Sequence, residues 1–534
     1  MKNFIKSAIC DGQATRLVTI ECSSTRGFPG LHLLGNTDAI CREGRERART
    51  VLENEGLQLP PRRLVLSLAP ADIPKDGNHF DLAFALVLAV LIRGNPPGHD
   101  PRKWLFAAEL GLDGGLRPVR RIIPFAIEAV RQGLRGIVIS PGNLRELQAL
   151  SRYGTRQLRR LQVVPFARFG EVLTWFTTGG PLPLPEAGPA TGEGAAESLP
   201  NFDDMVLTTE QETLAMTCAA GRHNLLLRGS PGTGKSMFAA RLPSLLLAMP
   251  GPRHMEALQI HSNGPGPLAP PLLRGVPPFR SPHHGASAAA VLGTPDEPGE
   301  ISLAHGGILF LDELPEFRRD LLEALREPLE TGEVRVARAR RKVTWQADII
   351  LVAACNNCPC GWAGSPRRRC QCPTQKAQAY NQRLSGPVQE RIDLHFNMPE
   401  NSQSPDQIFA GLHRPDAGQG TTERLRRSVA DALEFAAPRH HSLGVSGNSE
   451  LTPPMLEASS GLKREDFLTL IRDQFPAHLS GRAVTRGLRV ARTLADLEKS
   501  PAIRKAHLIQ SRNWQADLSA RDRGEATGIA GEYL

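Results

Sequence analysis

The chain has 534 residues, which is too many for one hydrophobic core, so we expect two to four domains. With 40% hydrophobic and 22% charged residues, it has the composition of an ordinary globular protein. A net charge of +9 favours an acidic partner, nucleic acid first, although charge alone is weak evidence. Its most apolar run, Leu82–Ile92, is about half of the roughly 20 residues that cross a bilayer, and Met1–Gly12 is polar. We therefore expect a cytoplasmic protein with no membrane partner.

A segment rich in Pro, Gly, Ala and Glu, residues 179–200, has almost nothing to bury and predicts a flexible linker. It separates an N-terminal domain from a larger core, and a polar stretch after Pro399 leads into a mostly helical segment. The predicted units are a domain over 1–178, the linker over 179–200, a core over 201–399 with a Cys-rich insertion at 355–373, a helical lid over 400–500 and a tail over 501–534.

A glycine-rich loop follows a short apolar strand, Asn224–Arg228, and precedes a segment whose apolar spacing suits a helix. Strand, loop, Lys-Ser and helix in this order predict a phosphate-binding loop, because the glycines let backbone N–H groups converge on a phosphate at a helix N-terminus. Lys235 is expected to reach the β- and γ-phosphates of ATP, and the Ser236 hydroxyl to bind Mg²⁺. The ATP-binding residues are Gly229, Ser230, Pro231, Gly232, Thr233, Gly234, Lys235 and Ser236.

Two later apolar segments end in polar residues. The first is followed by Asp312 and Glu313, at the strand end where ligands of parallel sheets bind. We expect Asp312 to hold Mg²⁺ and Glu313 to polarise the attacking water. The second, Asp348–Cys355, ends at Asn356, which would orient that water against the γ-phosphate; Asn357 is the alternative. Phosphate loop, acid pair and polar residue in this order resemble the AAA+ ATPases.

ATPases of this class need a positive charge against the transferred phosphoryl group. The segment Gly386–Asp393 resembles the arginine-finger segment of helicase-like AAA+ proteins, which implies that Arg391 reaches a neighbour's nucleotide. Arg482 stands at the start of a predicted helix that ends near Leu497, and the resemblance implies a second catalytic arginine that acts on the nucleotide of its own chain. Surface ion pairs are the alternative for both arginines. A finger acting on a neighbour implies a ring, and we expect a homo-hexamer.

Four cysteines form two C-x-C pairs between the predicted core strand and the next helix. Four thiolates can close a tetrahedral Zn²⁺ site, although spacers of two residues are commoner than one. Free cysteines are the alternative. The candidate zinc ligands are Cys358, Cys360, Cys370 and Cys372.

Several strings, in one order along nearly the whole chain, are similar to the magnesium-chelatase-like AAA+ proteins. The resemblance implies an α/β multidomain protein with an AAA+ P-loop core, whose parallel sheet is flanked by helices. It also implies an N-terminal Lon-protease-like (ribosomal S5 domain 2-like) α+β domain and a C-terminal helical lid. Family members tend to have Met-Asn-Pro-Cys where this chain has Cys355–Cys358, which leaves the choice between Asn356 and Asn357 open. The matching strings are Leu68–Lys75, Phe279–His284, Pro298–His305, Leu311–Phe317 and Leu322–Leu329.

The Lon-like resemblance does not imply protease activity. That chemistry needs a Ser nucleophile shortly after an Asp-Gly turn and a Lys to activate it. Here His79 stands where the Ser is expected, and Ile123 stands about where the Lys should fall. We therefore interpret the domain as a scaffold or a DNA-binding element.

A basic segment, Val334–Val343, alternates β-forming residues with cations and predicts a hairpin. In a ring, such hairpins would line a positive pore that follows DNA phosphates without reading bases. A solvated basic hairpin is the alternative. Arg486, Arg489 and Arg492 lie at helical spacing and either add to this surface or pack against acidic neighbours. The expected DNA contacts are Arg338, Arg340, Arg341 and Lys342.

The family resemblance implies an ATP-driven hexameric helicase that promotes branch migration during DNA recombination and natural transformation, with single-stranded or branched DNA as partner. The alternative is a chelatase-type motor that remodels a protein partner, which DNA stimulation of ATP hydrolysis would argue against. A non-catalytic scaffold is disfavoured because Lys235, Asp312, Glu313 and Asn356 are all intact. Adjacent His283 and His284 are interpreted as structural or pore-lining.

Overall fold

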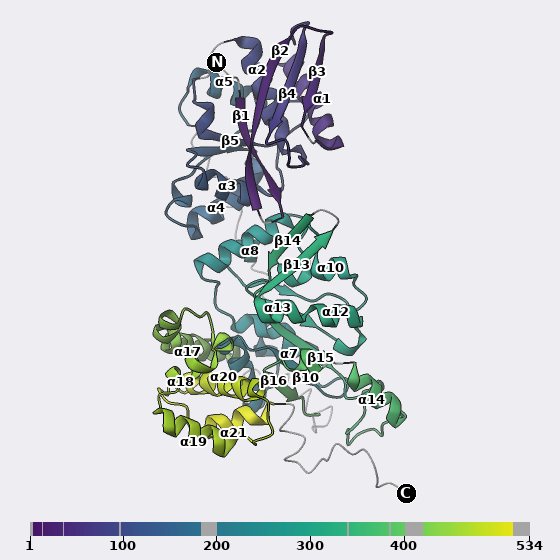
Figure 1. Cartoon of the computed structure of the whole chain (residues 1–534), viewed down its shortest axis with the longest axis vertical. Helices are drawn as coiled ribbons and strands as arrows, with labels where there is room; N and C mark the ends of the chain where they lie inside the picture. Colours follow the sequence, from purple (N-terminus) through teal and green to yellow (C-terminus); the bar gives the residue numbers. More distant parts are fainter. Residues whose placement is uncertain are drawn as a thin grey trace.

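The computed structural model describes residues 4–12, 14–35, 37–94, 98–182, 200–338, 341–383, 386–400 and 420–515. Figure 1 shows an N-terminal domain at one end of the long axis, a central α/β core, and a helical lid at the other end. This arrangement confirms the predicted α/β multidomain class. Within the described residues, no helix is both long and apolar enough to cross a membrane.

The N-terminal domain is built on a mixed seven-stranded sheet with the order β3-β4-β2-β1-β5-β8-β9. Strands β1, β2 and β4 pair antiparallel, and the β1, β5, β8 and β9 side is parallel. Successive side chains of a strand point to opposite faces of the sheet. On β1, Ile5 and Ile9 accordingly face one hydrophobic core, and Ala8 and Cys10 face the other. The strands are β1 (Phe4–Asp11), β2 (Ala14–Thr25), β3 (Gly30–Leu34), β4 (Arg63–Ala69), β5 (Trp104–Ala107), β8 (Gly136–Ile139) and β9 (Gln162–Pro165).

Helices cover both faces of this sheet, and a two-stranded ribbon of β6 (Glu109–Leu110) and β7 (Leu116–Arg117) lies beside it. Helix α2 contains the whole apolar run that the sequence analysis singled out, and it is buried over nearly its whole length. That run is therefore a core helix. The helices are α1 (Ala39–Asn54), α2 (Asp81–Arg93), α3 (Ile122–Arg131), α4 (Leu144–Tyr153) and α5 (Phe169–Thr178).

The position of the missing protease nucleophile is filled by a buried histidine. His79 is 5% exposed, its Nε2 lies 2.8 Å from the carbonyl oxygen of Ala8, and its ring packs on Phe80 and Phe125. Ile123 is fully buried in the other core. Both side chains are buried, so neither is placed as an exposed nucleophile or base would have to be.

Burial of His79 gives a test of the fold through pH. Desolvation lowers the pKa of His79 to about 3, so the folded domain keeps the ring neutral while the unfolded chain binds a proton below about pH 6.5. Stability therefore falls as pH drops below 6.5, and this one residue should cost about 2 kcal/mol at pH 5. Pulse proteolysis in urea at pH 7 and pH 5, scored on N-terminal fragments, measures this; His79→Gln should lose that share of the pH dependence. If the stability of the wild type and of His79→Gln fell equally between pH 7 and pH 5, this role of His79 would be contradicted.

The central core is a five-stranded, wholly parallel sheet with the order β11-β12-β15-β10-β16. Leu225 and Leu227 face one core while Leu226 faces the other, so β10 is buried on both sides, as a parallel sheet covered by helices requires. All strands run the same way, so the phosphate loop, the acid pair and Asn356 follow their strands at one edge of the sheet. The strands are β11 (Phe279–Arg280), β12 (Ile308–Leu311), β15 (Ile350–Cys355), β10 (Leu225–Arg228) and β16 (Leu394–Asn397).

Helices and one hairpin surround the core sheet. The hairpin pairs β13 with β14 in antiparallel register, from Glu333 opposite Gln346 to Arg338 opposite Arg341, and confirms the predicted hairpin. The elements are α6 (Thr209–Gly221), α7 (Lys235–Arg241), α8 (Gly251–Asn263), α9 (Pro270–Leu273), α10 (Ala288–Leu292), α11 (Glu300–Leu303), α12 (Arg319–Ala324), α13 (Arg326–Thr331), β13 (Glu333–Arg338), β14 (Arg341–Gln346), α14 (Thr374–Gln382) and α15 (Gly386–Gln389).

The N-terminal domain docks on α8 through a shared apolar core. Met249, Ala257 and Leu258 pack with residues of α3 and α4 in one cluster. Polar contacts continue the interface: Arg120 donates to the carbonyl oxygen of Gly264 at 2.6 Å, and Arg121 to that of Asp296 at 3.1 Å. The two domains are therefore joined by packing as well as by the predicted linker, most of which lies outside the described residues.

The lid is helical and packs on α6 of the core through α17 and α20. Its last helix, α21, packs on α20, and Trp514 is buried in the core cluster. The lid therefore extends to Gln515, which corrects the predicted boundary at 500. The helices are α17 (Thr421–Leu443), α18 (Pro453–Ser459), α19 (Arg464–Gln474), α20 (Gly481–Leu497) and α21 (Lys505–Asn513).

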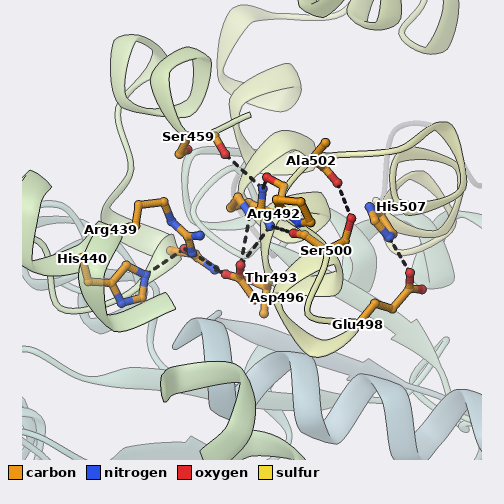
Figure 2. Close-up of polar contacts among 12 residues, drawn as sticks. Arg439, His440, Ser459, Arg492, Thr493, Asp496, Glu498, Ser500, Ala502 and His507 are labelled. Atoms are coloured by element: carbon orange, nitrogen blue, oxygen red, sulfur yellow. Dashed lines mark hydrogen bonds and ion pairs between the residues drawn. The ribbon is translucent and has the colours of Figure 1, made fainter. Parts of the chain in front are cut away.

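A buried arginine organises the lid. Arg492 is fully buried, donates to Asp496 at 3.0 Å, and also donates to the carbonyl oxygens of Ser459 and Ser500 (Figure 2). Arg486 and Arg489 donate to backbone carbonyls as well. Arg489 and Arg492 therefore hold the lid together, and Arg486 joins it to Gln389 of the core. The idea that these arginines extend a DNA surface is not supported.

Replacing Arg492 by Leu should lower the free energy of unfolding of the lid by about 3 to 5 kcal/mol, because it removes one of the two arginines paired with the buried Asp496 and leaves the carbonyl oxygens of Ser459 and Ser500 without this donor. Hydrogen exchange of α20 amides measures the loss. Arg427→Leu is the matched control: Arg427 is exposed and, among the described residues, pairs with Glu423 of its own helix, so the change should stay within about 0.5 kcal/mol. Similar effects in the two variants would contradict the account.

Candidate active site

The phosphate loop begins directly after β10 and ends at α7. Gly232 and Gly234 have φ values of 78° and 86°, which side chains rarely adopt, so the loop needs glycine at both. Lys235 folds back over it: Nζ donates to the carbonyl oxygens of Gly229 at 2.8 Å and Ser230 at 2.9 Å. Burial lowers the pKa of Lys235 from its ordinary value. A buried ammonium that donates to neutral carbonyl oxygens is well placed to exchange them for phosphate oxygens.

The acid pair follows β12. Asp312 accepts a hydrogen bond of 2.6 Å from the hydroxyl of Ser236. A hydroxyl and a carboxylate meeting at an exposed position supply the oxygen ligands that Mg²⁺ prefers, so this pair fits that ion. Glu313 has φ of 52°, an unusual conformation for a residue other than glycine, and its side chain is 54% exposed. The backbone thus turns Glu313 away from the sheet while Asp312 stays beside the phosphate loop.

Asn356 and Asn357 have separate surroundings. Asn356 Oδ1 accepts from Lys235 Nζ at 3.2 Å, so this side chain belongs to the phosphate loop. Asn357 Nδ2 instead donates to the carbonyl oxygen of Ala363, inside the Cys-rich segment. Of the two alternatives that the sequence leaves open, Asn356 is the one beside the candidate nucleotide site.

His284 is a site residue that the sequence analysis did not assign. Its Nδ1 lies 3.4 Å from Glu313 Oε2, and its ring packs beside those of His283 and Phe317. The imidazole can therefore orient the carboxylate of Glu313. In the sequence, the adjacent pair of histidines is the one signal for this residue. Its contact with Glu313 could not be predicted, because His284 and Glu313 are 29 positions apart and meet only in the folded chain.

The two candidate arginines lie together at the opposite edge of the sheet. Arg391 precedes β16, and its carbonyl oxygen accepts from Asn224 at the start of β10. Arg391 is mostly buried and pairs with Glu330; Arg482 is 67% exposed and lies 3.8 Å from Glu330 and 3.5 Å from Glu390. The core strands β10 and β16 have four residues each and rise about 3.3 Å per residue. The distance along the strands from this edge to the phosphate loop is therefore roughly 13 Å.

This placement corrects one prediction. Arg482 was expected to act on the nucleotide of its own chain, but α20 begins beside Arg391, where the core strands start and not where they end. Near the start of α20, Arg486 donates to the carbonyl oxygen of Gln389, two residues before Arg391, which fixes the start of the helix there. Within one chain, neither arginine meets the phosphate loop.

A cleft of about 1150 Å³ surrounds the arginine pair, between the core and the lid. Both signs of charge line it, and on its core side Arg222 and Arg253 pair with Asp348, at 3.2 and 2.5 Å. These ion pairs hold the pKa of Asp348 below its ordinary value although burial opposes them. The core side of the cleft is thus held by ion pairs.

The basic hairpin points away from the core toward the N-terminal domain, where Val343 contacts Gly12 (Figure 1). Val334 and Trp345 face inward, whereas Lys342 is exposed. The backbones of Arg338 and Arg341 pair in the last described register of the hairpin, but their side chains and all of Arg340 lie outside the described residues. Of the four expected DNA contacts, the structure thus describes the side chain of Lys342.

Comparison with known proteins decides the family. Models of magnesium chelatase subunit ChlI match residues 20–143 and 201–405, and a model of its C-terminal part matches 419–514. The competence protein ComM of Haemophilus influenzae is 35% identical over 95% of this chain and 96% of its own. The chain belongs to the magnesium-chelatase-like AAA+ ATPase family.

Other members of this AAA+ family match over similar lengths. The uncharacterized protein YifB of Escherichia coli is 34% identical over 93% of this chain and 94% of its own. A Lon protease of Salinispora arenicola is a weaker relative, 27% identical over 26% of this chain and 18% of its own, which agrees with a Lon-like resemblance in part of the chain. Family membership implies an ATPase, and the phosphate loop and acid pair described above are the parts that such an enzyme requires.

Proposed function

We propose that the protein is an ATP-driven motor that works on DNA as a homo-hexameric ring, with a role in branch migration during recombination or natural transformation. One observation carries the proposal. The phosphate loop, Asp312, Glu313 and Asn356 occupy one edge of the core sheet, while Arg391 and Arg482 occupy the other. Such a site is completed only when the arginine edge of one copy meets the phosphate loop of the next.

Each residue around the phosphate loop has a separate role in ATP hydrolysis. Lys235 and the loop amides bind the phosphates, and Ser236 and Asp312 would hold Mg²⁺, which neutralises charge between the β- and γ-phosphates when bound. Glu313 accepts a proton from the attacking water, and Asn356 orients that water. As the bond from water oxygen to the γ-phosphorus forms, the bond to the bridging oxygen breaks, and ADP departs with that electron pair.

The neighbouring copy supplies positive charge to the transition state. Arg391 and Arg482, now paired with Glu330 and Glu390, would exchange those acids for the γ-phosphate across the subunit boundary. Because both arginines lie in one cleft, a small rotation of one copy against the next changes both contacts together. ATP binding and hydrolysis would thereby move subunits relative to one another.

DNA is the proposed substrate because the chain carries a net charge of +9 and a basic hairpin. Each hairpin would present Arg338, Arg340, Arg341 and Lys342 toward the centre of the ring, where phosphates are contacted without regard to base sequence. ComM is named a competence protein, which favours DNA as the substrate. The free thiols and the need for ATP favour a cytoplasmic location.

A second candidate function follows from the matches to ChlI: a chelatase-type motor that remodels a protein partner. Steady-state ATP hydrolysis with and without single-stranded and branched DNA separates the two. The DNA motor predicts strong stimulation, which should be lost when Lys342 and its three neighbouring arginines become Ala. Arg318 and Arg427, both exposed and outside the hairpin, are matched controls. Robust hydrolysis that is indifferent to DNA would contradict the DNA motor and favour the protein partner.

A further inference from the structure

The Cys-rich segment between β15 and α14 brings four sulfur atoms together. The Sγ atom of Cys358 lies 3.4 Å from that of Cys360 and 3.6 Å from that of Cys370, and Cys360 and Cys370 are also 3.6 Å apart. With Cys372, all four sulfur atoms lie within 4.8 Å of one another. All four are free thiols, so no disulfide closes the segment.

These distances fit a metal better than they fit free cysteines. A Zn²⁺ ion with four sulfur ligands at about 2.3 Å in tetrahedral geometry requires sulfur atoms roughly 3.8 Å apart. Most residues from 359 to 373 are exposed or half-buried, so the segment has almost no apolar core of its own. Short segments of this kind take their folding energy from a structural metal.

The segment also lies directly against the phosphate loop. A Cβ built on Gly361 would lie 2.5 Å from both Cγ and Cδ of Pro231, so only glycine allows this approach. Pro231 stands between Ser230 and Gly232, inside the loop that surrounds the phosphates. The other side of the segment is fixed as well, because Asn357 donates to the carbonyl oxygen of Ala363 one residue after Asn356.

We propose that Cys358, Cys360, Cys370 and Cys372 bind one Zn²⁺ ion, and that the closed segment supports the phosphate loop through Gly361 and Pro231. The metal holds the segment in one conformation, and the segment prevents the loop from moving away from the nucleotide. Zinc thus raises the affinity for ATP without contacting the nucleotide. This inference rests on the proposed ATP site and is independent of DNA binding.

The first test measures zinc and nucleotide affinity in the full-length protein. Elemental analysis of protein purified from zinc-containing medium should give one zinc per chain, and Cys370→Ser with Cys372→Ser should lose it. Binding of a fluorescent ATP analogue with Mg²⁺ should weaken about tenfold in that variant. A wild-type protein without zinc would overturn the metal site.

A second pair of variants tests the coupling while leaving every cysteine in place. Gly361 and Gly364 both have left-handed backbones, with φ of 84° and 77°, but a Cβ on Gly364 meets nothing within 4 Å. Gly361→Ala should keep its zinc and bind the ATP analogue about tenfold more weakly, whereas Gly364→Ala should match the wild type within about twofold. Both substitutions place alanine in a left-handed backbone, so this strain is common to the two variants. The difference between their affinities for the ATP analogue therefore measures the effect of the contact with Pro231.

The outcomes separate this inference from the proposed function. Equal ATP affinity in Gly361→Ala and Gly364→Ala would overturn the coupling and leave the ATP site standing. Failure of the wild-type protein to bind the analogue would contradict the proposed function and the coupling together. Loss of DNA stimulation plays no part in either comparison.

Discussion

Replacing Glu313 by Gln is expected to lower the rate of ATP hydrolysis by about 10² to 10⁴-fold and to leave ATP binding intact. The amide keeps the size of the carboxylate and can still orient water, but it cannot accept the proton that the water must lose. Glu313 suits this role because its backbone turns it away from the sheet, half-exposed, while Asp312 stays with Ser236. Phosphate release and binding of a fluorescent ATP analogue, measured side by side, test both halves.

Glu316→Gln is the matched control for this substitution. Glu316 lies three positions further on, is also partly exposed, and forms an ion pair with Arg383 at 3.4 Å. Exposed pairs of this kind contribute little, so hydrolysis should stay close to the wild-type rate. Wild-type hydrolysis by Glu313→Gln would show that another group takes the proton, and His284 beside it would be the next candidate.

Replacing Arg391 by Ala should lower hydrolysis by about 10³-fold or more, again with ATP still bound. The reason is electrostatic: the transferred phosphoryl group gains negative charge that the neighbour's guanidinium would stabilise. Arg391 is mostly buried and held by Glu330, and its segment is tied to Asn224 on β10, so its position is well defined. Steady-state hydrolysis at saturating ATP measures the effect.

Arg318→Ala is the control for Arg391, because Arg318 is exposed and pairs only with Asp320 among the described ion pairs. Its removal should change hydrolysis less than about threefold. Size-exclusion chromatography must accompany the assay, since Arg391→Ala could act by weakening assembly. An inactive Arg391→Ala protein that still forms the ring supports the catalytic role; an active one contradicts it.

The contiguous parts of the site could be predicted from sequence because each combines a strand with the residues that follow it. Gly229–Ser236 after β10, and Asp312 and Glu313 after β12, have fixed places at the end of parallel strands whatever the rest of the chain does. The hairpin of β13 and β14 was predictable for a similar reason, since its alternation is local.

The parts that sequence could not supply depend on how distant segments pack. Arg482 follows a clear helical pattern, but the pattern does not say which edge of the core sheet the helix meets. His284 meets Glu313 only through the fold. Arg492 has the spacing of a basic stripe, yet Asp496 and three backbone carbonyls bury it completely. In each case tertiary packing, not local propensity, decides the role.

The claim that the ATP site is shared between two copies is tested most directly by mixing two inactive variants. Glu313→Gln keeps a working Arg391, and Arg391→Ala keeps a working Glu313. In randomly mixed rings from equal amounts, about one quarter of the boundaries would combine the intact Glu313 of one copy with the intact Arg391 of the next. The account predicts that hydrolysis returns on mixing, well above the sum of the two separate variants. No recovery from rings shown to contain both variants would contradict it.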